Sequence, residues 1–170
     1  MYNNISMIKG GNKGFTIVET LIVLAIAATI IIVVLLAVPA LQRNSRNTVV
    51  KTAANNILSG WAAEVANSNG ATPTTTAGTA GKITIGANIY TFASSVKTFV
   101  ATATVSSVAY GPTLGSTVVT PGAVVVLTTG VCTTPNTVAT TQAITVGTTA
   151  QVAILYPVEG TTGQVTCVQG

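Results

Sequence analysis

The sequence predicts an α+β protein in which one long N-terminal helix packs on a C-terminal antiparallel β-sheet domain. Three observations lead to this prediction. Residues 21–41 are apolar except for Thr29, residues 42–67 carry apolar side chains at helical spacing, and the remaining chain shows short strand patterns separated by Gly and Pro. The first half of the helix is therefore expected to span a membrane, and the second half to be amphipathic.

The apolar run is long enough to cross a bilayer. At 1.5 Å per residue, residues 21–41 extend for roughly 30 Å, which is the thickness of the hydrocarbon core. Pro39 lies inside the run, where it removes one helical hydrogen bond and crowds the preceding turn. A kink or a locally melted stretch is expected there.

The amphipathic half continues the same helix. Its apolar residues recur every three or four positions, at Val50, Ala54, Ile57, Trp61 and Val65. One helix is thus predicted from Phe15 to about Asn67, with Asn67-Ser68-Asn69-Gly70 as its stop signal. Its second half should bury one stripe against a sheet.

Residues 68–170 form the predicted β-sheet domain, which is rich in Thr. Residues 71–81 contain Pro73, Gly78 and Gly81 and are predicted to be a loop. Strands are predicted at residues 82–85, 89–92, 99–105, 122–128, 143–146, 151–156 and 164–168. The alternation in 99–105 is typical of a half-buried antiparallel strand, whereas the unbroken apolar run 123–127 indicates a central strand.

The two cysteines, Cys132 and Cys167, both follow the apolar run. An even number of cysteines on the exported side of a membrane favours one disulfide, and closing a loop of this length would stabilise the domain by roughly 3 to 4 kcal/mol. The alternative is a pair of buried free thiols, because spacing alone does not show that the two Cα atoms lie close together.

The composition argues against enzymatic, metal-dependent or cofactor-dependent function. The chain has no His and no Asp, and only 6% of its residues are charged. An imidazole-based triad or metal site cannot be built from it. Nucleic-acid binding would have to use scattered cations, namely Arg43, Arg46, Lys51, Lys82 and Lys97. Nucleic-acid binding normally needs clustered cations with interleaved aromatic residues, whereas Lys82 and Lys97 are isolated, so DNA uptake stays a less favoured hypothesis.

Glu19 is the unusual residue at the start of the apolar segment. A charge in such surroundings costs about 2.5 to 3.5 kcal/mol at the centre of a membrane helix and less near its end. A cationic partner is therefore expected. The simpler interpretation is an acidic residue in the first turn of a signal anchor, where the helix dipole favours negative charge.

Residues Lys13-Gly14-Phe15-Thr16-Ile17-Val18-Glu19, together with the apolar run, resemble the processing site of type IV prepilins. The resemblance covers about the first third of the chain. It implies that a prepilin peptidase removes the leader, residues 1–14, by cutting between Gly14 and Phe15. It further implies N-methylation of Phe15 and a role for Glu19 in filament assembly.

This resemblance implies the domain organisation and the function. Residues 1–14 would be the leader, 15–41 the hydrophobic filament-core helix, 42–67 its amphipathic continuation and 68–170 the globular domain. The chain would be the major subunit of a type IV pilus, a helical homo-oligomer that serves adhesion, motility or DNA uptake. The precursor would reside in the inner membrane with the pilus assembly machinery, and the product would be extracellular.

Two alternatives remain open at this point. The chain could be a minor pilin, or a pseudopilin of type II secretion or competence. Major pseudopilins generally carry a calcium site, and calcium prefers several carboxylate oxygens, of which the C-terminal region has few. The second alternative is a signal-anchored surface domain that never polymerises.

Overall fold

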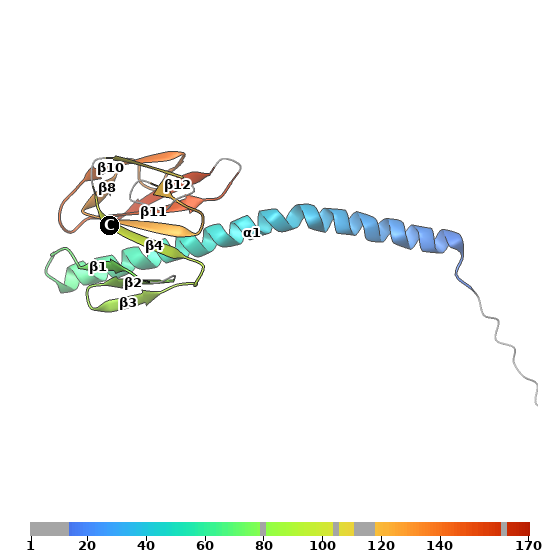
Figure 1. The fold of residues 1–170 in the computed structure, drawn as a ribbon, viewed down its shortest axis with the longest axis horizontal. Coiled ribbons are helices and arrows are strands. Elements are labelled where there is room, and N and C mark those ends of the chain that lie inside the picture. Colours follow the sequence, from blue (N-terminus) through green and yellow to red (C-terminus); the bar gives the residue numbers. More distant parts are fainter. Residues whose placement is uncertain (1–13, 79–80, 104–105, 111–117, 161–162) are drawn as a thin grey trace, which may run out of the picture. The chain divides into compact units, whose positions relative to one another are not determined.

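A computed structural model describes residues 14–78, 81–103, 106–110, 118–160 and 163–170 of the chain. The chain divides into two compact units, Met1–Ala40 and Leu41–Gly170. The helix α1, Ile17–Asn67, begins in the first unit and ends in the second (Figure 1). The predicted α+β class and long N-terminal helix are confirmed, and the helix begins two residues later than expected. Of the predicted leader, only Gly14 belongs to the described residues.

The described part of the second unit contains twelve strands. They are β1 (Thr75–Ala77), β2 (Lys82–Ile85), β3 (Asn88–Thr91), β4 (Lys97–Thr102), β5 (Ser106–Tyr110), β6 (Val118–Val119), β7 (Ala123–Thr128), β8 (Gly130–Cys132), β9 (Val138–Ala139), β10 (Thr141–Val146), β11 (Val152–Val158) and β12 (Gln164–Gln169). They form a three-stranded sheet in the order β1-β2-β3, a four-stranded sheet in the order β6-β5-β10-β8 and a five-stranded sheet in the order β4-β7-β11-β12-β9. All seven predicted strands have a counterpart here.

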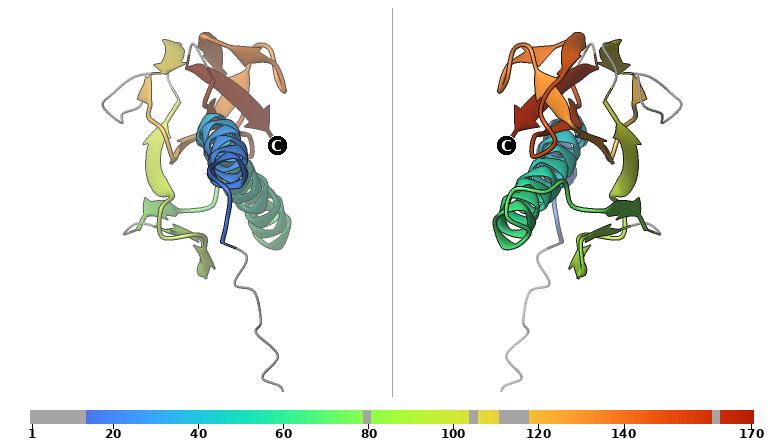
Figure 2. Two further views of the ribbon diagram at one scale, coloured as in Figure 1. Left: turned by 90° about the vertical axis from the view of Figure 1, so that its right-hand side faces the viewer. Right: turned by 90° about the vertical axis from the view of Figure 1, so that its left-hand side faces the viewer.

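The five-stranded sheet separates two hydrophobic cores, because its side chains point alternately to opposite faces. On one face, Val124 and Val126 of β7 join a core with the second half of α1 and with Ile83 and Ile85 of β2. Figures 1 and 2 show this half of α1, coloured cyan to green, flanked by the three-stranded sheet and by the five-stranded sheet.

The opposite face packs against the four-stranded sheet. There Val125 and Leu127 of β7 meet Val108 of β5 and Ile144 of β10. Alternate residues of β7 thus enter different cores, which explains why residues 123–127 read as an unbroken apolar run. The strand is interior, as predicted, although it lies second rather than third in its sheet.

The pairing of β4 corrects one prediction. Residues 97–102 pair in parallel with β7, from Lys97 opposite Ala123 to Thr102 opposite Thr128, so the alternating pattern was wrongly taken as antiparallel. Alternation reports only which side chains face a core, and it carries no information on strand direction. A second parallel pair joins β5 and β6, so the domain is mixed rather than purely antiparallel. Residues 104 and 105 of the predicted strand lie outside the described residues.

A second correction concerns the predicted loop over residues 71–81. Its middle, Thr75–Ala77, forms strand β1 at the edge of the three-stranded sheet, opposite Ile83 to Ile85 of β2. The three residues are half-buried or exposed, so they leave no apolar signature. The hydrogen bonds of the β2 backbone, rather than side-chain burial, hold this strand.

Two turns and the end of the helix follow the predicted chemistry. Gly86, at φ +59°, leads the two-residue connection between β2 and β3. Gly122, at φ +72°, follows Pro121 in a turn closed by a 3.1 Å hydrogen bond from the Ala123 N–H to the Thr120 carbonyl. The helix ends at Asn67, where Gly70 at φ +85° donates its N–H to the Val65 carbonyl at 2.8 Å.

Candidate functional site

The apolar segment of α1 is the outstanding surface feature of the first unit. Residues 14–41 are all exposed, and Phe15 and Ile17 each have 80% of their surface accessible. The segment is long and apolar enough to span a membrane. Apolar side chains occupy every face of this helical stretch, which is typical of a helix that meets lipid or apolar protein on all sides.

The few hydroxyl groups of this segment are satisfied within the helix. Thr20 donates its hydroxyl to the Ile17 carbonyl, and Thr29 donates to the Ile26 carbonyl, both at 2.8 Å. Such bonds let a Thr side chain reside in apolar surroundings without water. The segment therefore presents no unmet hydroxyl at Thr20 or Thr29 to a membrane or to a packed neighbour.

Thr16 caps the start of the helix. Its hydroxyl oxygen accepts a hydrogen bond from the Glu19 N–H at 3.2 Å, and its carbonyl accepts one from the Thr20 N–H at 3.2 Å. Thr16-Ile17-Val18-Glu19 has the spacing of a capping box, in which a Thr at the cap is followed three residues later by Glu or Gln. Sequence reasoning missed this role of Thr16, although its Thr-x-x-Glu signal was present.

Glu19 lies in the first turn and is exposed. The positive end of the helix dipole favours a carboxylate there. In the described part of the chain, Glu19 takes part in no ion pair. The helix terminus thus tolerates the charge, while the cation expected from the sequence is not supplied by the described residues of this chain.

Gly14 and Phe15, the residues of the predicted cleavage and methylation site, precede the helix in irregular backbone. Both are exposed, and a Cβ atom at Gly14 would meet no other atom within 4 Å. A peptidase could therefore reach this bond without unwinding α1. Cleavage and methylation themselves stay predictions.

Pro39 lies inside α1, and the helix is continuous through it. The expected melted stretch is therefore wrong for this structure, because the residues on both sides of Pro39 keep helical backbone. Proline still removes the hydrogen bond to the carbonyl four residues earlier. A kink at Pro39 stays a prediction.

Cys132 and Cys167 form the predicted disulfide, with their Cα atoms 5.9 Å apart. The bond joins β8 of the four-stranded sheet to β12 of the five-stranded sheet, and both residues are buried in the core between these sheets. It closes a sequence separation of 35 residues. The cystine thus joins the four-stranded sheet to the face of the five-stranded sheet that points away from α1.

The second half of α1 is held to its own domain by polar contacts as well as by apolar packing. Arg46 donates to both carboxylate oxygens of Glu159, with Nη2 2.6 Å from Oε2 and Nε 3.0 Å from Oε1. The Asn47 side chain bonds the Glu159 backbone twice: its Nδ2 donates to the Glu159 carbonyl at 3.1 Å, and its Oδ1 accepts from the Glu159 N–H at 2.8 Å. Further along, the Trp61 indole N–H donates to the Ala150 carbonyl at 2.8 Å.

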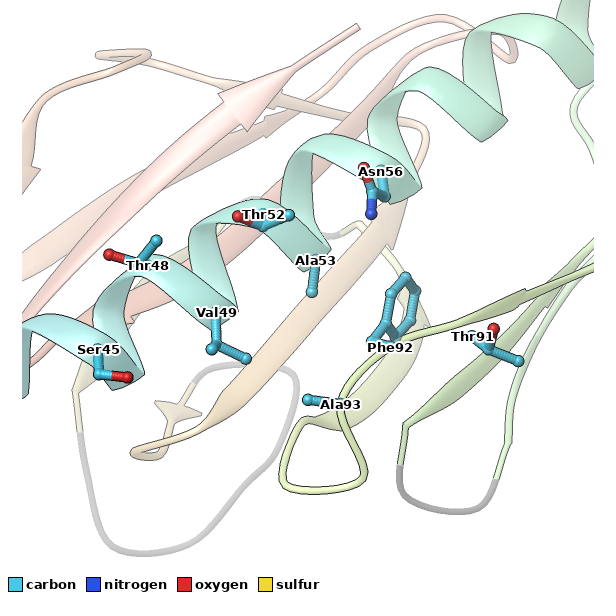
Figure 3. Close-up of a pocket in the computed structure, with 9 residues that line it drawn as sticks. All are labelled: Ser45, Thr48, Val49, Thr52, Ala53, Asn56, Thr91, Phe92 and Ala93. Carbon is cyan, nitrogen blue, oxygen red and sulfur yellow. The ribbon is translucent and has the colours of Figure 1, made fainter. Parts of the chain in front are cut away.

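A hollow of about 580 Å³ lies beside this half of the helix (Figure 3). Its lining consists of Ser45, Thr48, Val49, Thr52, Ala53 and Asn56 from α1 and Thr91, Phe92 and Ala93 from the end of the β2-β3 hairpin. In Figure 3, Val49 and Ala53 point toward Phe92 and Ala93. None of these side chains is charged, and the polar groups among them are the hydroxyls of Ser45, Thr48, Thr52 and Thr91 and the amide of Asn56.

The remaining cations are dispersed over the second unit. Arg43, Arg46 and Lys51 belong to α1, Lys82 to β2 and Lys97 to β4, and the Arg46 side chain is engaged with Glu159. Within the described ranges, no group of three or more His, Cys, Asp or Glu side chains comes together. Nucleic-acid binding stays untested by this arrangement.

Comparisons with protein-family models, with curated proteins and with solved structures find no match to this chain. The molecule is therefore defined by its own features. These are a long, exposed apolar helix with a capped start and a lone carboxylate, continuing into a disulfide-bonded α+β domain.

Proposed function

We propose that this chain is a structural subunit of a type IV pilus filament, most simply its major pilin. The observation that carries the proposal is the exposed apolar segment of α1, whose one carboxylate, Glu19, has no ion-pair partner in the described chain. A surface of this size needs a cover, and a carboxylate at its end needs a cation. Other copies of the same chain would supply both.

The cation would be the new amino terminus at Phe15. An α-amino group has an ordinary pKa near 7.7 to 8.0, so it is largely charged at neutral pH. In the filament, the amine of an incoming subunit would lie against Glu19 of a subunit already in place. Both charges would then be compensated inside an apolar bundle, which makes the pairing a condition of assembly.

The proposed life cycle begins in the inner membrane. The apolar segment would hold the precursor in the bilayer, prepilin peptidase would cut between Gly14 and Phe15, and the assembly machinery would move the subunit into the filament. Lipid contacts would be exchanged for equally apolar helix contacts. Repeated heterologous contacts build an open-ended fibre from one type of subunit, and this fibre would lie outside the cell.

Glu19→Gln is the decisive variant, because Gln serves a capping box as well as Glu does. It removes the charge and keeps the cap. We expect the yield of filaments sheared from cells to fall at least about tenfold, since breaking a desolvated ion pair costs more than the 1.4 kcal/mol that corresponds to a factor of ten. Thr16→Val, which removes the capping hydroxyl and keeps the charge, is the matched control and should assemble far better.

Mass spectrometry of the sheared filaments gives the second readout. The mature subunit should begin at N-methylated Phe15 and contain the cystine between Cys132 and Cys167. Filaments of normal yield with Glu19→Gln, or a mature chain that still begins at Met1, would contradict the proposal.

The second candidate is a signal-anchored surface domain that never polymerises. The Thr16 cap favours it, because a capping box gives Glu19 a local structural role without any partner. This candidate predicts an uncut bond between Gly14 and Phe15. It also predicts that Glu19→Gln leaves surface display unchanged while Thr16→Val weakens it, which is the reverse of the ranking above.

A further inference from the structure

Another hollow, of about 380 Å³, lies where α1 crosses the edge of the five-stranded sheet. It is lined by Asn47, Thr48, Lys51 and Asn55 of α1, by Asn136 and Val138, and by Tyr156, Val158, Thr166 and Val168 of β11 and β12. Its volume falls within the range of small-molecule sites, at the lower end. It differs from the hollow of Figure 3 in its charge, because it contains a lysine and no acid.

The floor of this hollow is one row across three strands. Thr166 of β12 is opposite Tyr156 of β11 on one side and opposite Val138 of β9 on the other. Thr166 is 4% exposed, and its hydroxyl is buried beside the Tyr156 phenol. The polar group of the floor is therefore the Tyr156 phenol, and the valines of the same strands supply its apolar surface.

The Tyr156 phenol beside it is a hydrogen-bond donor at neutral pH. Burial raises its pKa, and the neighbouring Thr166 hydroxyl offsets that increase only in part. The phenol therefore stays protonated. Hydroxyl donors and acceptors on an otherwise apolar floor are suited to a ligand with both a hydrocarbon ring and hydroxyl groups.

The rim supplies further donors. Lys51 and Asn55 lie four residues apart on α1 and hence on the same helical face, and Asn136 lies in the connection between β8 and β9. In the ranges that the structure describes, none of these three side chains makes a hydrogen bond or an ion pair. The ammonium of Lys51 thus faces a hollow without a compensating carboxylate.

The backbone around the rim is held in place before any ligand binds. Asn47 is bonded twice to the backbone of Glu159, which secures α1 to the connection between β11 and β12. Asn136, at φ +59°, donates its N–H to the Cys167 carbonyl at 2.8 Å. Rim and floor are therefore fixed relative to each other, which lowers the entropic cost of binding.

We propose that this hollow binds an acidic monosaccharide. The Lys51 ammonium donates a charge-assisted hydrogen bond to the carboxylate of the sugar, and the Asn55 and Asn136 side chains bond the ring hydroxyls. The Tyr156 phenol bonds a further hydroxyl at the floor, while Val138, Val158 and Val168 contact the ring carbons. An inorganic anion alone would leave most of the 380 Å³ unfilled.

The test is isothermal titration of glucuronate into the full chain in detergent micelles, so that filament assembly plays no part. The wild-type chain should bind glucuronate. Glucose, which has the same ring without the carboxylate, and acetate, which has the carboxylate without the ring, should each bind at least about tenfold more weakly.

Variants then locate the site. Lys51→Met should lower glucuronate affinity at least about tenfold, because it removes one charge-assisted bond, and Tyr156→Phe should lower it by a smaller factor. Lys82→Met removes an exposed lysine on β2 and should leave the affinity unchanged. The melting temperature of each variant shows that the domain is folded.

Three results would overturn the proposal. They are the absence of glucuronate binding at millimolar concentration, equal affinity for acetate and glucuronate, and equal affinity of the Lys51→Met and Lys82→Met variants. Because every measurement uses unassembled protein, these results are independent of whether the chain forms filaments.

Discussion

The two halves of α1 belong to one continuous helix but differ in composition and in surroundings, because the earlier half is almost entirely apolar and the later half is amphipathic. Residues 17–40 include no buried residue, whereas the later half buries Val50, Ala53, Ala54, Ile57, Gly60 and Trp61 against its own domain. The later half has one apolar face and one polar face, whereas the earlier half is apolar on every face. The difference teaches that the domain uses only one half of the helix for its own stability and leaves the other half for contacts outside the chain.

The sharpest way to test this comparison is to shorten one large apolar side chain in each half. Trp61 is 1% exposed and belongs to the core around α1, so Trp61→Ala should lower the free energy of unfolding of the domain by about 3 to 5 kcal/mol. Leu24, which is 65% exposed, is the matched position. Leu24→Ala should change the same quantity by less than about 0.5 kcal/mol.

Urea denaturation of the full chain in micelles, followed by circular dichroism, measures both variants. Leu24→Ala should instead weaken membrane retention or lower the filament yield, because Leu24 belongs to the apolar segment. Equal losses of stability at the two positions would show that the domain depends on the apolar half, contrary to the comparison.

Removing the disulfide tests how the core between the four-stranded and five-stranded sheets, which lies away from α1, is held together. Replacing both cysteines, in Cys132→Ser/Cys167→Ser, should lower the free energy of unfolding by roughly 3 to 4 kcal/mol, because the unfolded chain loses its loop constraint. Wild-type protein under reducing conditions should show a similar loss. Denaturation followed by Trp61 fluorescence is the measurement, and a change below about 1 kcal/mol would mean that packing alone holds the two sheets.

Replacing Gly60 by Ala should change the stability of the domain by a smaller amount, and in the direction opposite to that usual for Gly→Ala in a helix. An Ala normally stabilises a helix by about 1 kcal/mol relative to Gly, yet a Cβ at Gly60 would lie 2.4 Å from the Tyr90 ring. Gly60→Ala should therefore destabilise the domain by about 1 to 3 kcal/mol, as overpacking does.

Ser59→Ala, at the exposed neighbouring position, is the control for Gly60→Ala and should be neutral or slightly stabilising. The two melting temperatures can be compared directly. If Gly60→Ala raised the melting temperature, Tyr90 would have to be free to move away, and the close packing of this half of α1 would be refuted.

Much of the fold could be predicted because the signals are local. Helical spacing located α1 to within two residues at its start and correctly at its end, and apolar runs located all seven predicted strands. The prediction missed β1, β5, β6, β8 and β9, which have two to five residues each. Such short strands are held by backbone pairing, which has no side-chain periodicity to detect.

The candidate site could likewise be predicted only in part from the sequence. Glu19 and the apolar run were visible in the sequence, and the Thr16 cap could have been read from its spacing to Glu19. The pairing of Arg46 with Glu159 could not, because 113 residues separate the two side chains. Arg46 had been considered as a contact for nucleic acid, but the fold places it against a carboxylate of its own domain.

By itself, the sequence determined where one apolar helix begins, that its first half has no polar face, and that a single carboxylate stands near its start. These properties follow from residue type and spacing within a few turns. Only the tertiary structure decided that β4 runs parallel to β7, that Cys132 and Cys167 come within bonding distance, and that Lys51 faces a hollow without an acid. The physical reason is that pairing between distant segments depends on how the whole chain closes its loops, which no local pattern records.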